Sequence, residues 1–254
     1  MLRFRFELRP LREVKPWGAD RPTLHWFGLT DGWYWIEAGD HEFLRYTDEA
    51  VRRWDLRRPY PDYYVARLWE DLIVLRWALQ EPVPADLVPF VNGTFARREF
   101  PDADDFGVEV EAAFDFQGDH LVDFGYLTHA PTLFCWRHYA EGRDVVTLSQ
   151  HVPAGGRGTF AGPPRREVTV PAAEFFDAVD DLDRRLVSAM EGRVAEAEGE
   201  PLAGIDLDLG QLRAEHERRR RWRELRAAEP RHVGWAAVRA GAAEIASWPP
   251  LELP

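Results

Sequence analysis

The spacing of apolar and polar side chains predicts a β-rich N-terminal portion. Residues Leu2–Leu8 alternate apolar side chains with charged ones, which is the period of a strand with one face in water. Two aromatic-rich runs follow, Thr23–Leu29 and Trp33–Glu37, and Thr30-Asp31-Gly32 joins them. An Asp-Gly pair between such runs predicts a hairpin turn, because glycine readily takes the positive φ that the turn requires. His41–Tyr46 completes the group as a third strand.

A central helix is predicted over Tyr63–Gln80. Apolar side chains recur there at helical spacing, and prolines stand before and after the segment. The apolar stripe includes Val65, Leu68, Leu72, Leu75 and Leu79. A helix with so wide a stripe is expected to pack against the sheet.

A second hairpin is predicted from Thr132–Ala140 and Asp144–His151, two β-rich segments on either side of a short loop. A turn centred on Gly142-Arg143 gives three cross-strand pairs on one face: Trp136 with Ser149, His138 with Thr147, and Phe134 with His151. Cys135 then points to the opposite face, away from His138. We expect Cys135 to be a small buried apolar side chain rather than a nucleophile.

The pattern becomes helical after the Gly- and Pro-rich stretch Pro153–Pro164. Pro171 opens an amphipathic helix, and Asp206 or Asp208 is placed to cap a second one. Val233–Ser247 is Ala-rich and predicts a third helix.

The predicted fold class is therefore α+β. Residues 1–165 form a β-rich domain of antiparallel or mixed strands with the packed central helix. Residues 166–254 form a helical portion, which is either separate or packed onto the first as one domain.

The net charge of −12 bears on the choice of partner. Nucleic-acid binding needs an electropositive surface, so the acidity disfavours it and favours a basic protein partner. A basic run, Arg218–Arg221, looks like a nucleic-acid contact in isolation. Glu215, Glu217 and Glu224 are interleaved with it at helical spacing and partly neutralise it, so a solvated helix face is the better interpretation.

Other features indicate a cytoplasmic protein that does not contact the membrane. The chain has no run of about 18 apolar residues, and its first residues lack the apolar core of a signal peptide. The single Cys135 excludes an intramolecular disulfide, which fits a reducing compartment. The composition is also compatible with a homodimer.

Four of the eleven tryptophans fall within Pro16–Tyr46, where they fix a fold or an interface. Several stretches carry a resemblance: FRFELRPL at Phe4–Leu11, PWG at Pro16–Gly18, TLHWFGLTDGWYWI at Thr23–Ile36, HLVDFGYLTHAPTLFCWR at His120–Arg137 and LRAEHERRRRW at Leu212–Trp222. In these motifs the chain resembles an uncharacterised bacterial family that is classified as a domain of unknown function. The resemblance implies no activity, cofactor or catalytic residue.

Polar side chains gather around the second predicted hairpin: His120, Asp123, Tyr126, His129, His138 and His151. An imidazole beside hydroxyls and carboxylates can act as a general base or a metal ligand. The spacing matches neither H-x-x-x-H, H-E-x-x-H nor a pair of cysteines, so we expect no metal and no cofactor. Hydrogen-bonded or surface histidines are the more ordinary explanation.

The segment Asp102–Asp123 holds eight carboxylates and neither Lys nor Arg. Its apolar positions fit a helix or a strand and favour the helix. It lacks the D-x-D-x-D-G pattern of a calcium loop. A solvated face is its ordinary role, and Asp102, Asp104 and Asp105 are our candidates for contact with a basic partner.

We therefore expect a non-enzymatic protein-binding module, with toxin neutralisation as one form of this role. Binding is assigned to Asp102, Asp104, Asp105, Trp136 and His138. The alternative is a hydrolase or a nucleotide-modifying enzyme that uses His138, His151, Asp123 and Glu215. Nucleic-acid contact through residues 218–226 is a third, weaker hypothesis.

Overall fold

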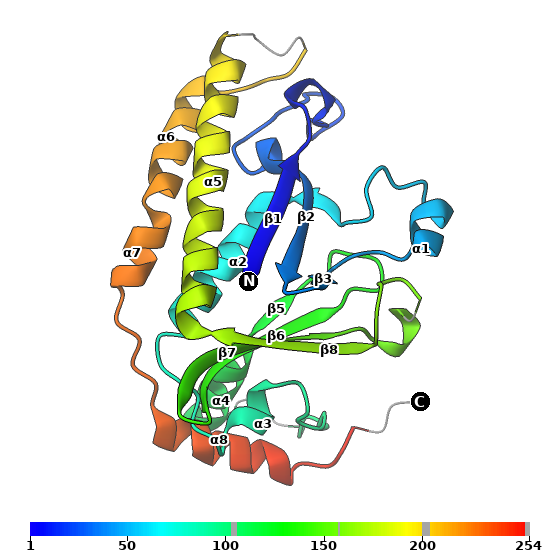
Figure 1. Ribbon diagram of the computed structural model, residues 1–254. Coiled ribbons are helices and arrows are strands. Elements are labelled where there is room, and N and C mark those ends of the chain that lie inside the picture. Colours follow the sequence, from blue (N-terminus) through cyan, green and yellow to red (C-terminus); the bar gives the residue numbers. More distant parts are fainter. Residues whose placement is uncertain (103–105, 157, 200–203, 252–254) are drawn as a thin grey trace. The chain divides into compact units, whose positions relative to one another are not determined.

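The computed structural model describes residues 1–102, 106–156, 158–199 and 204–251 (Figure 1). The fold is α+β, as predicted, with antiparallel sheets followed by helices in the C-terminal half. Contacts between Cα atoms divide the chain into two compact units. Unit 1 consists of Met1–Ile73, Gly156–Gly162 and Ala173–Glu229, and unit 2 consists of Val74–Gly155, Pro163–Ala172 and Pro230–Pro254. Each unit contains residues from both sides of residue 165.

Unit 1 is built on a sheet of four antiparallel strands: β1 (Leu2–Leu8), β2 (Asp31–Ala38), β3 (His41–Phe43) and β4 (Asp62–Tyr64). β1 pairs along the length of β2, whereas β3 and β4 pair with the two ends of β2. In this register Phe4 lies opposite Ile36, and both side chains are buried. The alternation of apolar and charged residues in β1 thus separates a core face from a polar face.

The predicted hairpin turn at Thr30-Asp31-Gly32 is wrong. Asp31 and Gly32 are the first residues of β2, and a 3-10 helix, η2 (Gly28–Thr30), precedes them. Gly32 lies opposite Leu8 of β1, and a Cβ on Gly32 would be 2.3 Å from the backbone oxygen of Glu7. The glycine therefore serves the close approach of two strands rather than a turn.

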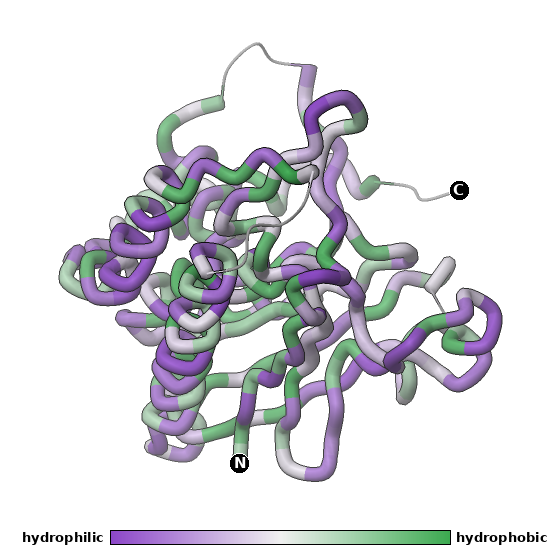
Figure 2. The backbone as a smooth tube through the Cα atoms, turned by 90° about the horizontal axis from the view of Figure 1, so that it is seen from above, coloured by the Kyte–Doolittle hydropathy of each residue, from purple (hydrophilic) through white to green (hydrophobic). Residues whose placement is uncertain are grey.

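Helix α5 (Ala172–Gly199) runs beside β1 in unit 1 (Figure 1). Its predicted apolar stripe is buried: Phe175, Val179, Leu182, Leu186, Met190 and Val194. The Phe175 ring meets Phe4 of β1 edge to face, with the ring centroids 6.0 Å apart. Hydrophobic and hydrophilic residues alternate along the chain, as the colours in Figure 2 show. The amphipathic pattern thus places α5 on the sheet.

The remaining helices of unit 1 are η1 (Leu11–Glu13), α1 (Asp48–Arg53), α6 (Leu209–Arg220) and α7 (Trp222–Ala228). The predicted central helix is α2 (Val65–Ala78), which begins in unit 1. Asp208 caps α6, because its side chain accepts a hydrogen bond of 2.9 Å from the backbone N–H of Gln211. The single helix expected after this cap is divided into two at Arg221.

Unit 2 contains the second antiparallel sheet: β5 (Leu121–Asp123), β6 (Thr132–Ala140), β7 (Arg143–His151) and β8 (Arg165–Pro171), in that order. Its helices are α3 (Val88–Val91), α4 (Val108–Gly118), α8 (Trp235–Ser247) and the 3-10 turn η3 (Ala154–Gly156). The helix favoured within the acidic segment is thus α4. Its Val110, Ala113 and Phe116 pack with Ile245 of α8 and Trp136 of β6 in one apolar core.

The β6–β7 hairpin differs from the prediction by two positions in register. Its turn is Glu141-Gly142, and both residues have positive φ, 51° and 75°. Trp136 consequently lies opposite Thr147 rather than Ser149. A shift of two residues keeps every side chain on its face, so the predicted face composition is still found. Cys135 is fully buried on the opposite face, and burial raises the pKa of its thiol.

Candidate functional site

A depression of about 650 Å³ in unit 2 contains His138, one of the predicted binding residues. It is lined by residues 82–85, Val88, His138 and Tyr139. The Tyr139 side chain is 67% exposed, which makes it one of the few large apolar side chains that face solvent in the described residues. The wall is thus mainly proline, valine and aromatic, with one imidazole.

Arg137 of β6 attaches the proline-rich wall to the sheet. Its guanidinium donates two hydrogen bonds, of 2.8 and 2.7 Å, to the Asp144 carboxylate of β7. It also donates to the backbone oxygen of Gln80 at 2.6 Å, and its own backbone oxygen accepts from Val83 at 2.7 Å. The hydrogen bond from Arg137 lowers the pKa of Asp144, which keeps this carboxylate ionised. Arg137 therefore fixes both the proline-rich wall and strand β7 in place beside the depression.

His138 is half-buried and points along a row of hydroxyl groups. Its Nε2 lies 3.4 Å from Oγ1 of Thr147, which is 2.8 Å from Oγ1 of Thr169. Its Nδ1 is buried and has no hydrogen-bond partner within the described part of the chain. Burial lowers the pKa of His138, although Asp144 and Glu167 act in the opposite direction. The imidazole is therefore neutral at pH 7, and the two acids that act on it are themselves paired, Asp144 with Arg137 and Glu167 with Arg165.

Trp136 does not contribute a contact surface, although it was predicted to bind. Its side chain is 3% exposed and belongs to the core beneath α3 and α4. The ring centroid lies 6.1 Å from that of His138. Trp136 therefore supports the site from inside.

The other candidate catalytic groups do not meet His138. His138 lies opposite Val145, six residues before His151 on β7, so about 20 Å of strand separates the two imidazoles. His151 Nε2 is 3.0 Å from Oγ of Ser149, but Ser149 is fully buried. Asp123 is exposed, and its carboxylate accepts from the backbone N–H of Gly125.

Glu215 lies in unit 1, where it is paired with an arginine. Its carboxylate accepts from Nε of Arg219 at 3.0 Å, and Arg219 also contacts Glu70. Arg223 binds Asp183 at 2.9 Å in the same way. The basic run is therefore partly neutralised, as expected, and it meets acids of α2, α5 and α6.

The acidic segment places several carboxylates in solvent. Asp102 is exposed, as are Glu109, Glu111 and Asp115 of α4. Asp119 is 2.8 Å from the buried Arg231 guanidinium. The predicted binding residues Asp104 and Asp105 lie outside the described residues.

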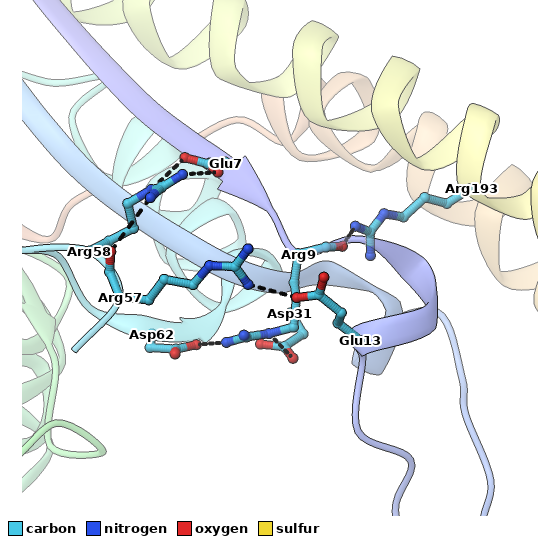
Figure 3. Close-up of polar contacts among 8 residues, drawn as sticks. All are labelled: Glu7, Arg9, Glu13, Asp31, Arg57, Arg58, Asp62 and Arg193. Atoms are coloured by element: carbon cyan, nitrogen blue, oxygen red, sulfur yellow. Dashed lines mark hydrogen bonds and ion pairs between the residues drawn. The ribbon is translucent and has the colours of Figure 1, made fainter. Parts of the chain in front are cut away.

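A charged cluster in unit 1 was not predicted (Figure 3). Arg9 lies between Asp31, 2.9 Å away, and Asp62, and its guanidinium covers the Trp33 ring. Arg193 of α5 donates to the backbone oxygens of Leu29 and Arg9. Burial outweighs the attraction of Arg9 and raises the pKa of Asp31. Because Arg9 pairs with two carboxylates and Arg193 donates to two backbone oxygens, the cluster connects the end of β1 and the start of β2 to α5.

No pattern within a sequence window reveals this cluster, because Arg9, Asp31, Asp62 and Arg193 come from four distant segments. The only sequence signal is the polar face of β1, where Arg3, Arg5, Glu7 and Arg9 alternate with apolar residues. That signal predicts ion pairs across the sheet but does not name their partners.

Within the described residues, no group of three or more His, Cys, Asp or Glu side chains is arranged to hold a metal ion. None of the helices in the described ranges combines the length and apolarity needed to cross a membrane.

Comparison with known proteins gives one match. No curated protein and no solved structure is significantly similar to the chain. Residues 3–241 match a family described as "Family of unknown function (DUF5984)", which covers nearly all of the chain. The chain therefore belongs to this family, DUF5984.

Proposed function

We propose that this protein is a non-enzymatic binding protein whose partner inserts an apolar or aromatic side chain beside His138 and Tyr139. The observation that carries the proposal is an apolar depression of about 650 Å³ next to a tyrosine that is 67% exposed. Tyrosine is enriched at the energetic centres of protein interfaces, because it buries a large area at a low cost in side-chain entropy. A wall anchored by Arg137 favours binding, since little has to be ordered on association.

The partner is a basic protein. The charge of the whole chain supports this, because the acids beside the depression, Asp144, Glu167 and Glu141, are each paired with an arginine. With a net charge of −12, the whole chain attracts a cationic partner at long range. Neutralisation of a basic toxin in the cytoplasm is one form of this function.

The alternative is a hydrolase or a nucleotide-modifying enzyme. The hydrogen bond between Ser149 and His151 is the observation in its favour. A nucleophile must reach its substrate, however, and Ser149 has no exposed surface. An enzyme would have to open this part of the sheet, so binding is the better supported role.

Site-specific photo-crosslinking in the native cell tests the proposal. Tyr139 is replaced by p-benzoyl-L-phenylalanine, and Leu225 of α7, which is 51% exposed, carries the same group as the matched control. We expect one crosslinked protein of basic isoelectric point at position 139, absent from position 225. The adduct should disappear when Ala85, an exposed lining residue, is also changed to Arg. Equal crosslinking at both positions would reject the site.

A further inference from the structure

A second surface of unit 2 carries a cluster of aromatic side chains, one of them exposed, that the proposed binding site does not use. Phe100 is 66% exposed, and its ring stacks on Phe114 of α4 with the centroids 5.6 Å apart. Phe106 and Trp248 lie 5.9 Å from the same ring. Phe100, Phe106, Phe114 and Trp248 together form what we call the Phe100 patch. A cavity of about 310 Å³ opens beside it, lined in part by Phe95, Arg98 and Leu251.

Hydrogen bonds join the backbone before Phe100 to the segment that carries Trp248. The N–H of Glu99 donates to Pro249 at 2.9 Å, and the N–H of Leu251 donates to Arg97 at 3.0 Å. The Arg98 side chain donates to the backbone oxygen of Trp248 at 3.2 Å. An exposed phenylalanine on a backbone fixed in this way loses little entropy when it is buried, which favours an interface.

Charges of both signs flank Phe100 within a few residues. Arg97, Glu99 and Asp102 are all exposed. No Lys or Arg occurs between Glu99 and Trp136, so Arg97 and Arg98 are the positive charges that precede the acidic segment in the sequence. A surface with both signs beside an apolar centre is complementary to itself under a two-fold axis.

We propose that the Phe100 patch binds a second copy of this chain. Around a two-fold axis near Phe100, the segment of one copy runs antiparallel to that of the other, and Arg97 of each copy meets Asp102 of the other. The two Phe100 rings are buried at the centre. Elsewhere the acidity of the chain opposes self-association, since like charges repel, whereas this segment supplies the opposite charge.

Sedimentation velocity of the full-length protein tests the proposal. We expect the wild type to sediment as a dimer of the 29.4 kDa chain and to dissociate on dilution. Phe100→Asp should raise the Kd of the dimer at least about tenfold, because it places a charge at the apolar centre. Leu225→Asp, at a matched exposed apolar position, should leave the Kd unchanged. A wild type that is monomeric at its highest soluble concentration overturns the proposal.

A charge exchange tests the antiparallel pairing itself. Arg97→Glu alone and Asp102→Arg alone should each weaken the dimer, since each brings like charges together. A mixture of the two single variants should form a heterodimer tighter than either homodimer, because both contacts then pair opposite charges. The double variant Arg97→Glu/Asp102→Arg should likewise recover the wild-type Kd. Failure of both recoveries with folded proteins rules out the two-fold arrangement.

Discussion

Arg185 of α5 donates a hydrogen bond of 2.6 Å to the backbone oxygen of Phe4 in β1. Two more side chains of α5 form hydrogen bonds with backbone groups in or next to β1. Glu174 accepts from the N–H of Leu2, and Arg193 donates to the oxygen of Arg9. β1 pairs with β2 on one side only, so its other edge would otherwise be open to pairing with another chain. Helix α5 thus protects the edge of the sheet as well as its face.

Arg185→Ala should expose this edge. We expect the free energy of unfolding to fall by about 1–2 kcal/mol, because the Phe4 oxygen loses its donor. We also expect faster aggregation on heating, measured by light scattering. Arg184→Ala is the matched control, since Arg184 is 70% exposed and its ion pair is with Asp181 on its own helix; its effect should stay within about 0.5 kcal/mol. Equal effects of the two changes would contradict the protective role of Arg185.

Gly241 of α8 allows α8 to approach α4. A Cβ at this position would lie 1.9 Å from the backbone oxygen of Glu109, so Gly241→Ala should destabilise the protein by about 2 kcal/mol or more. Gly192 lies in α5 with open space around it. Gly192→Ala should therefore stabilise the protein by about 0.5–1 kcal/mol through helix propensity alone. Urea denaturation measures both changes, and a stable Gly241→Ala protein would refute the close helix contact.

The fold was partly predictable because periodicity is a local property. The stripe of α5 and the alternation in β1 are visible within their own segments, and both are confirmed. The turn of the second hairpin was misplaced by one residue, since nothing local indicates that Glu141 takes a positive φ. Gly32 was assigned to a turn because only the neighbouring strand reveals that its missing side chain makes room for Glu7.

The candidate site was less predictable for the same reason. His138 was identified from its chemistry, but the depression beside it depends on residues 82–85, more than fifty positions earlier. Trp136 was expected at the surface because it lies on the same hairpin face as His138. The core formed with α4 and α8 covers only part of that face, and Trp136 lies in the covered part.

His120 should make the fold sensitive to acid. The imidazole is fully buried, its Nδ1 lies 2.7 Å from the backbone oxygen of Phe116, and burial lowers its pKa to about 4. The imidazole of the unfolded chain binds a proton near pH 6.5, whereas that of the folded chain does not. The free energy of unfolding is therefore undiminished above pH 6.5, and it decreases as the pH falls towards 4. The full loss is ~3 kcal/mol.

Urea denaturation at pH 7 and pH 4.5 checks this effect against a variant without the imidazole. His120→Gln keeps a side-chain N–H for Phe116 but does not titrate. The difference in unfolding free energy between the two pH values should be smaller in His120→Gln than in the wild type. The same acid sensitivity in both proteins would assign the effect to other groups.

The most direct test of the proposed function is the Kd for the protein captured at position 139, measured by isothermal titration calorimetry. Ala85→Arg fills the depression beside His138 with a bulky charged side chain, whereas Ala19→Arg adds the same side chain at an exposed position in unit 1. We expect Ala85→Arg to raise the Kd at least about tenfold and Ala19→Arg to leave it unchanged. An unchanged Kd for Ala85→Arg would contradict binding at this site.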